Sequence, residues 1–100
     1  MAVEIINDGE RLLARLSGEI DHHSAAQMRF SIDGELDRAV PRLLILDFSG
    51  VDFMDSSGIG LILGRLKRIS GWGGRLAVAN PKPPVKKMIA LAGLERLIQK

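Results

Sequence analysis

The residues most able to carry chemistry lie in one short segment, Asp55-Ser56-Ser57-Gly58. A carboxylate precedes two hydroxyls there, and a helix is expected to follow because apolar residues recur at helical spacing from Ile59 onward. A helix N-terminus offers unpaired N–H groups and a partial positive charge, so it accommodates a phosphate dianion. The segment is therefore a candidate phosphoacceptor site.

A simpler interpretation of the same residues is a helix cap. Ser and Asp are preferred N-cap residues, each contributing about 1 kcal/mol. If Ser57 carried a phosphate, the negative charge of Asp55 would repel the phosphate charge. The modification would then change the electric field at the surface and leave the fold intact. The sequence alone leaves the cap and the phosphoacceptor both open.

Enzymatic interpretations fit less well. A nucleophile elbow requires Gly-x-Ser-x-Gly, and Asp55 occupies the first glycine position around Ser57. His22 and His23 are potential bases, but a chain of 100 residues leaves little room for a substrate pocket. We therefore expect no catalytic residues and no enzyme activity.

Nucleotide and metal sites find only weak support. Gly58, Gly60 and Gly64 depart from the spacing of the dinucleotide fingerprint, although a small nucleotide-binding module remains an alternative. Adjacent His22 and His23 lack the spacing of a helix-borne metal site, so no metal is expected.

Composition indicates one soluble globular domain. Apolar residues make up 46% of the 100 residues, charged residues 26%, and there is no cysteine to form a disulfide. We find no signal peptide and no stretch approaching the ~20 apolar residues of a membrane span, so we expect a cytoplasmic protein without membrane contact. The formal net charge is +2, but scattered basic residues with Trp72 as their only aromatic neighbour give no reason to expect direct nucleic-acid binding.

Hydrophobic periodicity predicts the strands that position the segment. A strand at 2–6, a tight turn centred on Asp8-Gly9 and a strand at 12–16 form a leading hairpin, after which residues 17–23 are expected to leave the sheet. The apolar run at 43–48 is typical of a strand buried on both faces, and residues 49–55 are expected to be a loop. Shorter strands are expected at 76–79 and at 97–98.

Three helices are expected between these strands. The first begins at Asp21 or Ser24, since either could cap it, and ends before Pro41. A second follows Ser57, and a third follows the pair of prolines at 83–84 and ends near Gly93. The expected buried positions are Ala25, Met28, Ile32, Leu36 and Ala39 in the first helix, Ile59, Ile62, Leu63, Leu66 and Ile69 in the second, and Val85, Met88, Ile89 and Ala92 in the third. The fold class is α/β, a mixed β-sheet of order β-β-α-β-α-β-α-β with helices packed on it.

Three segments together resemble one known family. Residues 53–65, Phe-Met-Asp-Ser-Ser-Gly-Ile-Gly-Leu-Ile-Leu-Gly-Arg, look like the phosphorylation-site segment of the anti-sigma factor antagonists of the STAS domain family. Residues 18–23, Gly-Glu-Ile-Asp-His-His, look like the start of the first helix in its sporulation branch. Residues 84–94 are similar to its third helix and the following turn. The likeness spans essentially the whole chain in one register.

This resemblance implies a partner-switching regulator. The unphosphorylated form would bind an anti-sigma factor that is also a serine kinase, releasing a sporulation sigma factor. The kinase would use ATP to phosphorylate the second serine of the motif, Ser57, with Ser56 as the fallback, and a PP2C-type phosphatase would reverse the step. No cofactor of the chain itself is implied. The predicted partner-binding residues are Glu19, Asp21, His22, Asp55, Ser56, Gly58 and Ile59, and Asp52 extends the acidic surface.

Two expectations concern the extent of the chain and its role. The family usually continues past the equivalent of Ile98 into another helix, so residues 1–100 are expected to be a STAS domain without that helix. We expect a monomer, although the missing helix could leave apolar surface that favours self-association. A STAS scaffold domain of a stress-signalling assembly is the alternative within the family.

Overall fold

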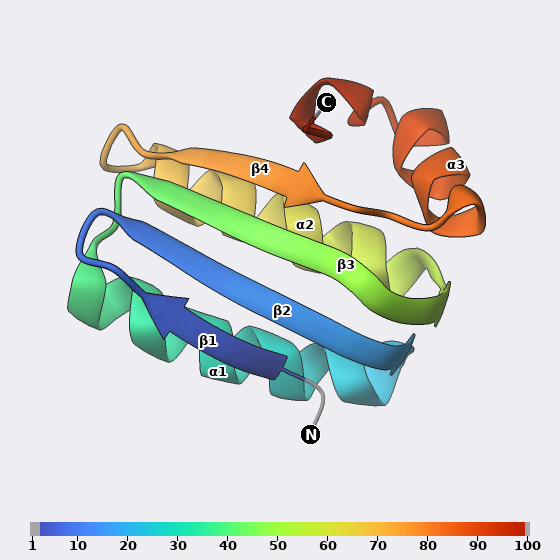
Figure 1. Ribbon diagram of the computed structural model, residues 1–100, viewed down its shortest axis with the longest axis horizontal. Helices are drawn as coiled ribbons and strands as arrows, with labels where there is room; N and C mark the ends of the chain where they lie inside the picture. Colours follow the sequence, from blue (N-terminus) through green and yellow to red (C-terminus); the bar gives the residue numbers. More distant parts are fainter. Residues whose placement is uncertain (1–2, 100) are drawn as a thin grey trace.

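A four-stranded sheet with helices packed against it forms the fold in the computed structural model, which describes residues 3–99 (Figure 1). The elements follow in the order β1 (Val3–Asn7), β2 (Arg11–Ile20), α1 (His22–Ala39), β3 (Leu43–Met54), α2 (Ser56–Ser70), β4 (Arg75–Ala79), α3 (Pro83–Leu91) and the short 3-10 helix η1 (Glu95–Leu97). The predicted α/β class with a leading hairpin is confirmed. Ala2, the first residue of the predicted 2–6 strand, lies outside the described residues.

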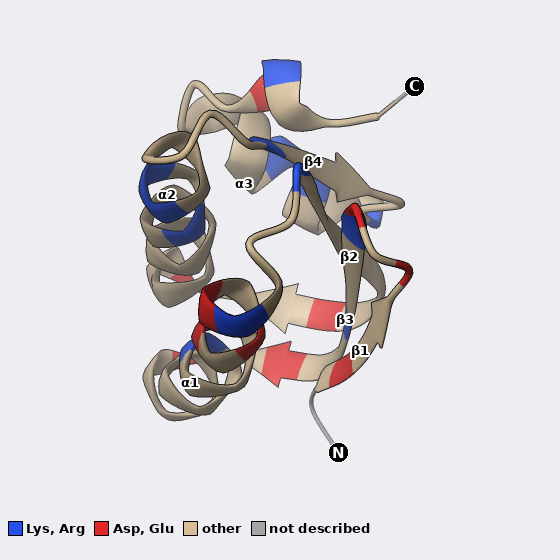
Figure 2. Ribbon diagram, turned by 90° about the vertical axis from the view of Figure 1, so that its left-hand side faces the viewer, with Lys and Arg blue, Asp and Glu red and all other residues tan. Residues whose placement is uncertain are grey.

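The sheet is mixed, with strand order β1-β2-β3-β4. β1 pairs antiparallel with β2, while β2 with β3 and β3 with β4 are parallel pairs. Helices α1 and α2 lie side by side on one face of the sheet (Figures 1 and 2), and α3 lies past the carboxyl end of β4 (Figure 1). Gly9, with φ of 99°, makes the hairpin turn as predicted.

The two central strands are longer than predicted. Residues 17–20 were expected to leave the sheet, but they extend β2, and residues 49–54 extend β3 where a loop was expected. The pairing continues through register shifts between Arg15 and Ser17 and between Gly18 and Glu19. Gly18 has a φ of 86°, a backbone conformation that glycine adopts readily and residues with a side chain rarely do. These bulges disrupt the alternating pattern on which the sequence prediction relied.

The core is aliphatic, as the composition predicts. Its largest fully buried side chains are Phe48, Leu12, Leu16, Ile20, Met28, Ile32, Leu36, Leu44, Leu46, Ile62, Ile69 and Ile89. The predicted face of α1 is buried except Ala39, which is half-buried. Two predictions are wrong: Leu63 is exposed on α2, where Leu61 and Arg65 are buried instead, and Ala92 follows α3 as an exposed cap residue.

Asp21 is the N-cap of α1. Its Oδ1 accepts a hydrogen bond from the Ser24 N–H at 2.9 Å, and the Asp21 N–H donates to Ser24 Oγ at the same distance. The two residues named by the sequence are therefore the two halves of one capping box. The Ser24 hydroxyl also donates to the Glu19 carbonyl at 2.9 Å, which fixes the start of α1 against the end of β2.

The segment after β4 follows the prediction only in part. Pro83 begins α3, and Gly93 takes a φ of 80° beyond its end. The predicted strand at 97–98 is wrong: Leu97 ends the 3-10 helix, and Ile98 forms a single parallel bridge with Val78. Within residues 3–99 no helix is both long and apolar enough to cross a membrane.

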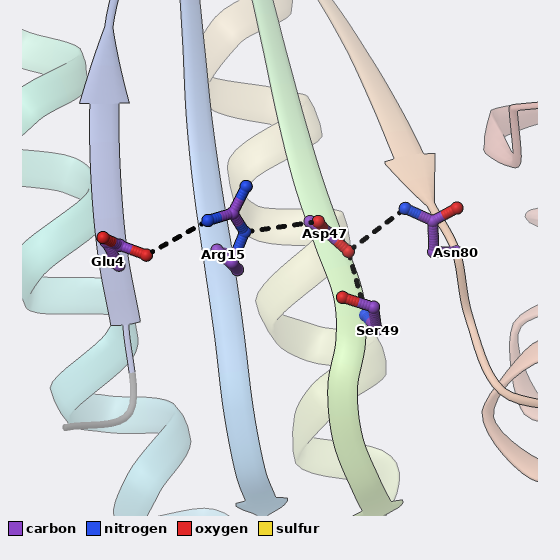
Figure 3. A network of polar contacts seen from close by, with 5 residues as sticks. All are labelled: Glu4, Arg15, Asp47, Ser49 and Asn80. Atoms are coloured by element: carbon purple, nitrogen blue, oxygen red, sulfur yellow. Dashed lines mark hydrogen bonds and ion pairs between the residues drawn. The ribbon is translucent and has the colours of Figure 1, made fainter.

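A row of polar side chains crosses the sheet face opposite α1 and α2 (Figure 3). Arg15 Nη1 lies 3.3 Å from Glu4 Oε1, and Arg15 Nε lies 3.6 Å from Asp47 Oδ2. Asp47 Oδ1 accepts from the Ser49 N–H at 2.9 Å and from the Asn80 amide at 3.4 Å. Burial alone would raise the pKa of Asp47, but these donors and the Arg15 charge outweigh it and lower the pKa below the ordinary 3.8.

This network predicts acid sensitivity. A carboxyl whose pKa is depressed by folding stabilises the fold above its unfolded-state pKa, and the stabilisation is lost as the pH falls through the folded-state value. Asp47→Asn is therefore expected to flatten the acid limb of the free energy of unfolding below the ordinary value of 3.8, by up to about 1.4 kcal/mol per pH unit. Urea unfolding of both proteins at a series of acidic pH values measures this, and identical acid limbs would contradict it.

Candidate functional site

The carboxyl ends of β2 and β3 lie next to each other. Ile20 pairs with Met54 at the last position of both strands, and the Asp55 N–H donates to the Ile20 carbonyl at 3.0 Å. One residue after the end of each strand a helix begins: α1 follows Asp21, and α2 follows Asp55. Two helix N-termini, each capped by an aspartate, therefore meet at one edge of the sheet. Ligands of open α/β sheets commonly bind outside the carboxyl ends of the strands.

The two serines occupy the first turn of α2. Asp55 is the N-cap, and its Oδ1 accepts a 2.8 Å hydrogen bond from the Ser57 N–H. Ser56 is exposed and Ser57 is half-buried. The cap interpretation of the motif is thus correct for Asp55, and both serine hydroxyls are without a hydrogen bond within residues 3–99. Asp55 therefore caps α2 without using either hydroxyl.

Gly58 sets how closely α2 approaches the sheet. A Cβ at this position would lie 2.1 Å from Met54 Cγ and 2.2 Å from Met54 Sδ, and both Gly58 and Met54 are buried. No ordinary side chain fits there unless Met54 moves. Gly58 was predicted to contact a partner, and its burial gives it instead a spacing role beneath the two serines.

The other predicted partner residues share this edge. Glu19, Asp21 and His22 are exposed at the end of β2 and the start of α1, and Ile59 is half-buried on α2, packed against the core. Ile59 therefore combines the two roles weighed from the sequence, core residue and apolar surface. Asp52 is exposed, and its Oδ1 pairs with Lys82 Nζ at 2.5 Å, so a neighbouring cation partly offsets its charge.

Sequence reasoning missed two features of this edge. One is Phe53, which was placed in a loop but stands 54% exposed on β3, in register with Glu19. The other is a groove of about 450 Å³ between α1 and α2, to which Ser57, His22 and Arg29 contribute. Small residues at helical spacing, Ala25 and Ala26 facing Gly60 and Gly64, were the available signal for the groove.

A buried ion pair holds the two helices together below the groove. Arg65 on α2 is only 5% exposed, and its Nε lies 2.8 Å from Asp33 Oδ1 on α1. The contact is an ion pair rather than a linear hydrogen bond, because the Nε–H does not point at the oxygen. Burial lowers the pKa of Arg65, and the Asp33 charge opposes that effect. Arg68 adds a second link, with its Nη2 2.5 Å from Asp37 Oδ1.

Comparison with known proteins decides the family. The family described as STAS domain matches residues 2–100. This chain belongs to the STAS domain family. It is 40% identical over 87 residues to an anti-sigma F factor antagonist of Paenibacillus polymyxa, an alignment that covers 87% of this chain and 74% of that protein. The corresponding protein of Lysinibacillus sphaericus is 38% identical over 85 residues, covering 85% and 73%.

Solved STAS structures share the fold along almost the whole chain. The unphosphorylated form of the anti-sigma factor antagonist SpoIIAA superposes with a TM-score of 0.89 at 34% identity, covering 98% of this chain and 86% of that one. The phosphorylated form of the Bacillus cell fate determinant SpoIIAA gives 0.81 at 33% identity, covering 98% and 89%. The same fold thus exists in an unphosphorylated and a phosphorylated relative.

Two glycines of α2 test whether Gly58 sets the distance between α2 and the sheet. Gly58→Ala is expected to destabilise the fold, because overpacking against Met54 costs about 1–3 kcal/mol and the gain in helix propensity offsets only about 1 kcal/mol. Gly60→Ala is the matched control, since nothing lies within 4 Å of its added Cβ and only the propensity gain applies. Thermal unfolding should therefore show a lower Tm for the first and an equal or higher Tm for the second. The reverse order would contradict the spacing role of Gly58.

Proposed function

We propose that this STAS protein is an anti-sigma factor antagonist that binds its anti-sigma factor through the edge formed by the N-termini of α1 and α2. The observation that carries the proposal is Ser57, half-buried in the first turn of α2 with Asp55 as cap, in a chain about 40% identical to an anti-sigma F factor antagonist. The binding surface comprises Glu19, Asp21, His22, Asp55, Ser56 and Ile59 around that serine, with Gly58 as the spacer beneath. We propose that the process regulated by this antagonist is sporulation.

Phosphorylation of Ser57 is the proposed off switch. A phosphoserine adds a charge of about −1.5 to −2 at neutral pH. Burying that charge at an interface without a new cationic partner costs several kcal/mol, and every 1.4 kcal/mol weakens binding about tenfold. Ser57 lies on a rigid helix turn anchored to the core, so the charge changes the surface and not the fold. SpoIIAA, a relative of the same fold, has a phosphorylated form, which supports phosphorylation as the switch.

The partners in this cycle are those that the resemblance to the anti-sigma factor antagonists implies. The anti-sigma factor would itself be the serine kinase, using ATP, and a PP2C-type phosphatase would restore the hydroxyl. The chain would need no cofactor and perform no catalysis. We expect it to act as a monomer and without direct contact to nucleic acid.

Two alternatives make different predictions. A STAS scaffold of a stress-signalling assembly would bind its partner stably whatever the state of Ser57. A nucleotide-binding module would bind ATP or GTP saturably without any protein partner. The similarity to anti-sigma F factor antagonists over 87% of the chain favours the antagonist.

The phosphorylation site is testable directly. Incubation with the candidate anti-sigma kinase and ATP is expected to add one phosphate, detected by intact mass and located by peptide mapping. Ser57→Ala should abolish the gain, because the acceptor hydroxyl is gone, whereas Ser56→Ala is the matched control and should retain it. A phosphate that persists in Ser57→Ala and maps to Ser56 would correct the site. Binding without any phosphate would favour the scaffold.

A further inference from the structure

The groove between α1 and α2 has an unusual balance of charge. Its lining combines Ser57 from α2 with His22 and Arg29 from α1 and the buried Arg65, and it contains no carboxylate among the described residues. Figure 2 shows acidic and basic residues close together on α1. The charged residues of α2, in contrast, are all basic. The groove beside Ser57 is therefore a locally cationic surface.

Arg29 is the cation in this groove without a counter-charge. Arg65 is already paired with Asp33, and Arg68 with Asp33 and Asp37. Arg29 is exposed and has no ion pair within residues 3–99. It also lies close enough to Arg65 for its charge to help lower the pKa of that buried guanidinium. An anion placed in the groove would meet a free guanidinium and relieve this repulsion.

A phosphate on Ser57 is the anion best placed to enter. On one side of Ser57 stands the Asp55 carboxylate, which accepts the Ser57 N–H at 2.8 Å and repels a second negative charge. On the other side is the groove, with Arg29 and His22 across from it. Small residues, Ala26, Gly60 and Gly64, keep this space open. Repulsion from the cap and attraction from α1 both turn the phosphate toward the groove.

We propose that the phosphate of phosphorylated Ser57 is held in the groove by Arg29 of α1, with His22 as a second donor at its rim, so that the modification links α1 to α2. The inference rests on the proposed phosphorylation of Ser57 and adds the receiving site. The phosphate would then weaken partner binding in two ways. It adds negative charge to the binding edge, and it engages His22 and Arg29 so that they no longer contact a partner.

The test installs phosphoserine at position 57 during translation, so that it needs no kinase. A neighbouring guanidinium favours the dianion and should lower the second pKa of the phosphate, ordinarily about 6, by about one unit. Phosphorus NMR titration of the folded protein measures this pKa. The titratable and charged residues around the phosphate are His22, Arg29, Arg65, Asp33 and Asp55. Arg29→Gln should return the phosphate pKa toward its ordinary value. Because the phosphate links α1 to α2, it should also raise the Tm of the unmutated chain, and Arg29→Gln should remove that rise.

Lys67→Gln is the matched control, because Lys67 is an exposed cation on α2 outside the groove. It should leave the lowered phosphate pKa in place. Equal phosphate pKa values in the Arg29→Gln protein and its parent would overturn the inference. So would an equal loss of the shift in Lys67→Gln, since the effect would then come from the general field of the protein. Binding of the same phosphoprotein to the anti-sigma factor, measured separately, tests the proposed function, so the two can fail independently.

Discussion

The parallel pairing of β2 with β3 is the constraint on which the site depends. Because both strands end in register at Ile20 and Met54, the chain enters α1 and α2 at the same edge, each through an aspartate cap. Gly58 then lets α2 lie directly over Met54, and the Arg65–Asp33 ion pair holds α2 against α1. A slip of one residue in this pairing would turn the buried side chains of the shifted strand to the opposite face of the sheet and separate the two helix starts.

This construction suits a switch that acts at the surface. Asp55 caps α2, so Ser57 is free to change chemically without the loss of a cap. Ile59 packs on the core two residues after the serine, which ties the exposed edge to the hydrophobic core. A charge added at Ser57 therefore has little structure to disturb and a binding surface to alter. The polar row through Asp47 lies on the other face of the sheet, where it sets acid stability without touching this edge (Figure 3).

Sequence reasoning succeeded where one local rule governed one element. Gly9 marked the hairpin, Pro41 the end of α1 and Pro83 the start of α3, and the motif at 55–58 marked the start of α2. It failed where two segments determine each other. The extensions of β2 and β3 exist because each pairs with the other through bulges, and Arg65 is buried because α1 supplies Asp33. The groove beside Ser57 likewise arises from two helices distant in sequence, so neither one alone indicates it.

The central claim is that one phosphate on Ser57 abolishes partner binding while the fold remains the same. Calorimetric titration of the unphosphorylated and Ser57-phosphorylated chains with the anti-sigma factor, paired with backbone NMR spectra of both, tests it most directly. The account predicts at least a hundredfold weaker binding on phosphorylation, which corresponds to about 2.7 kcal/mol. It also predicts spectral changes confined to the first turns of α1 and α2. Equal affinities, or changes spread through the sheet, would contradict it.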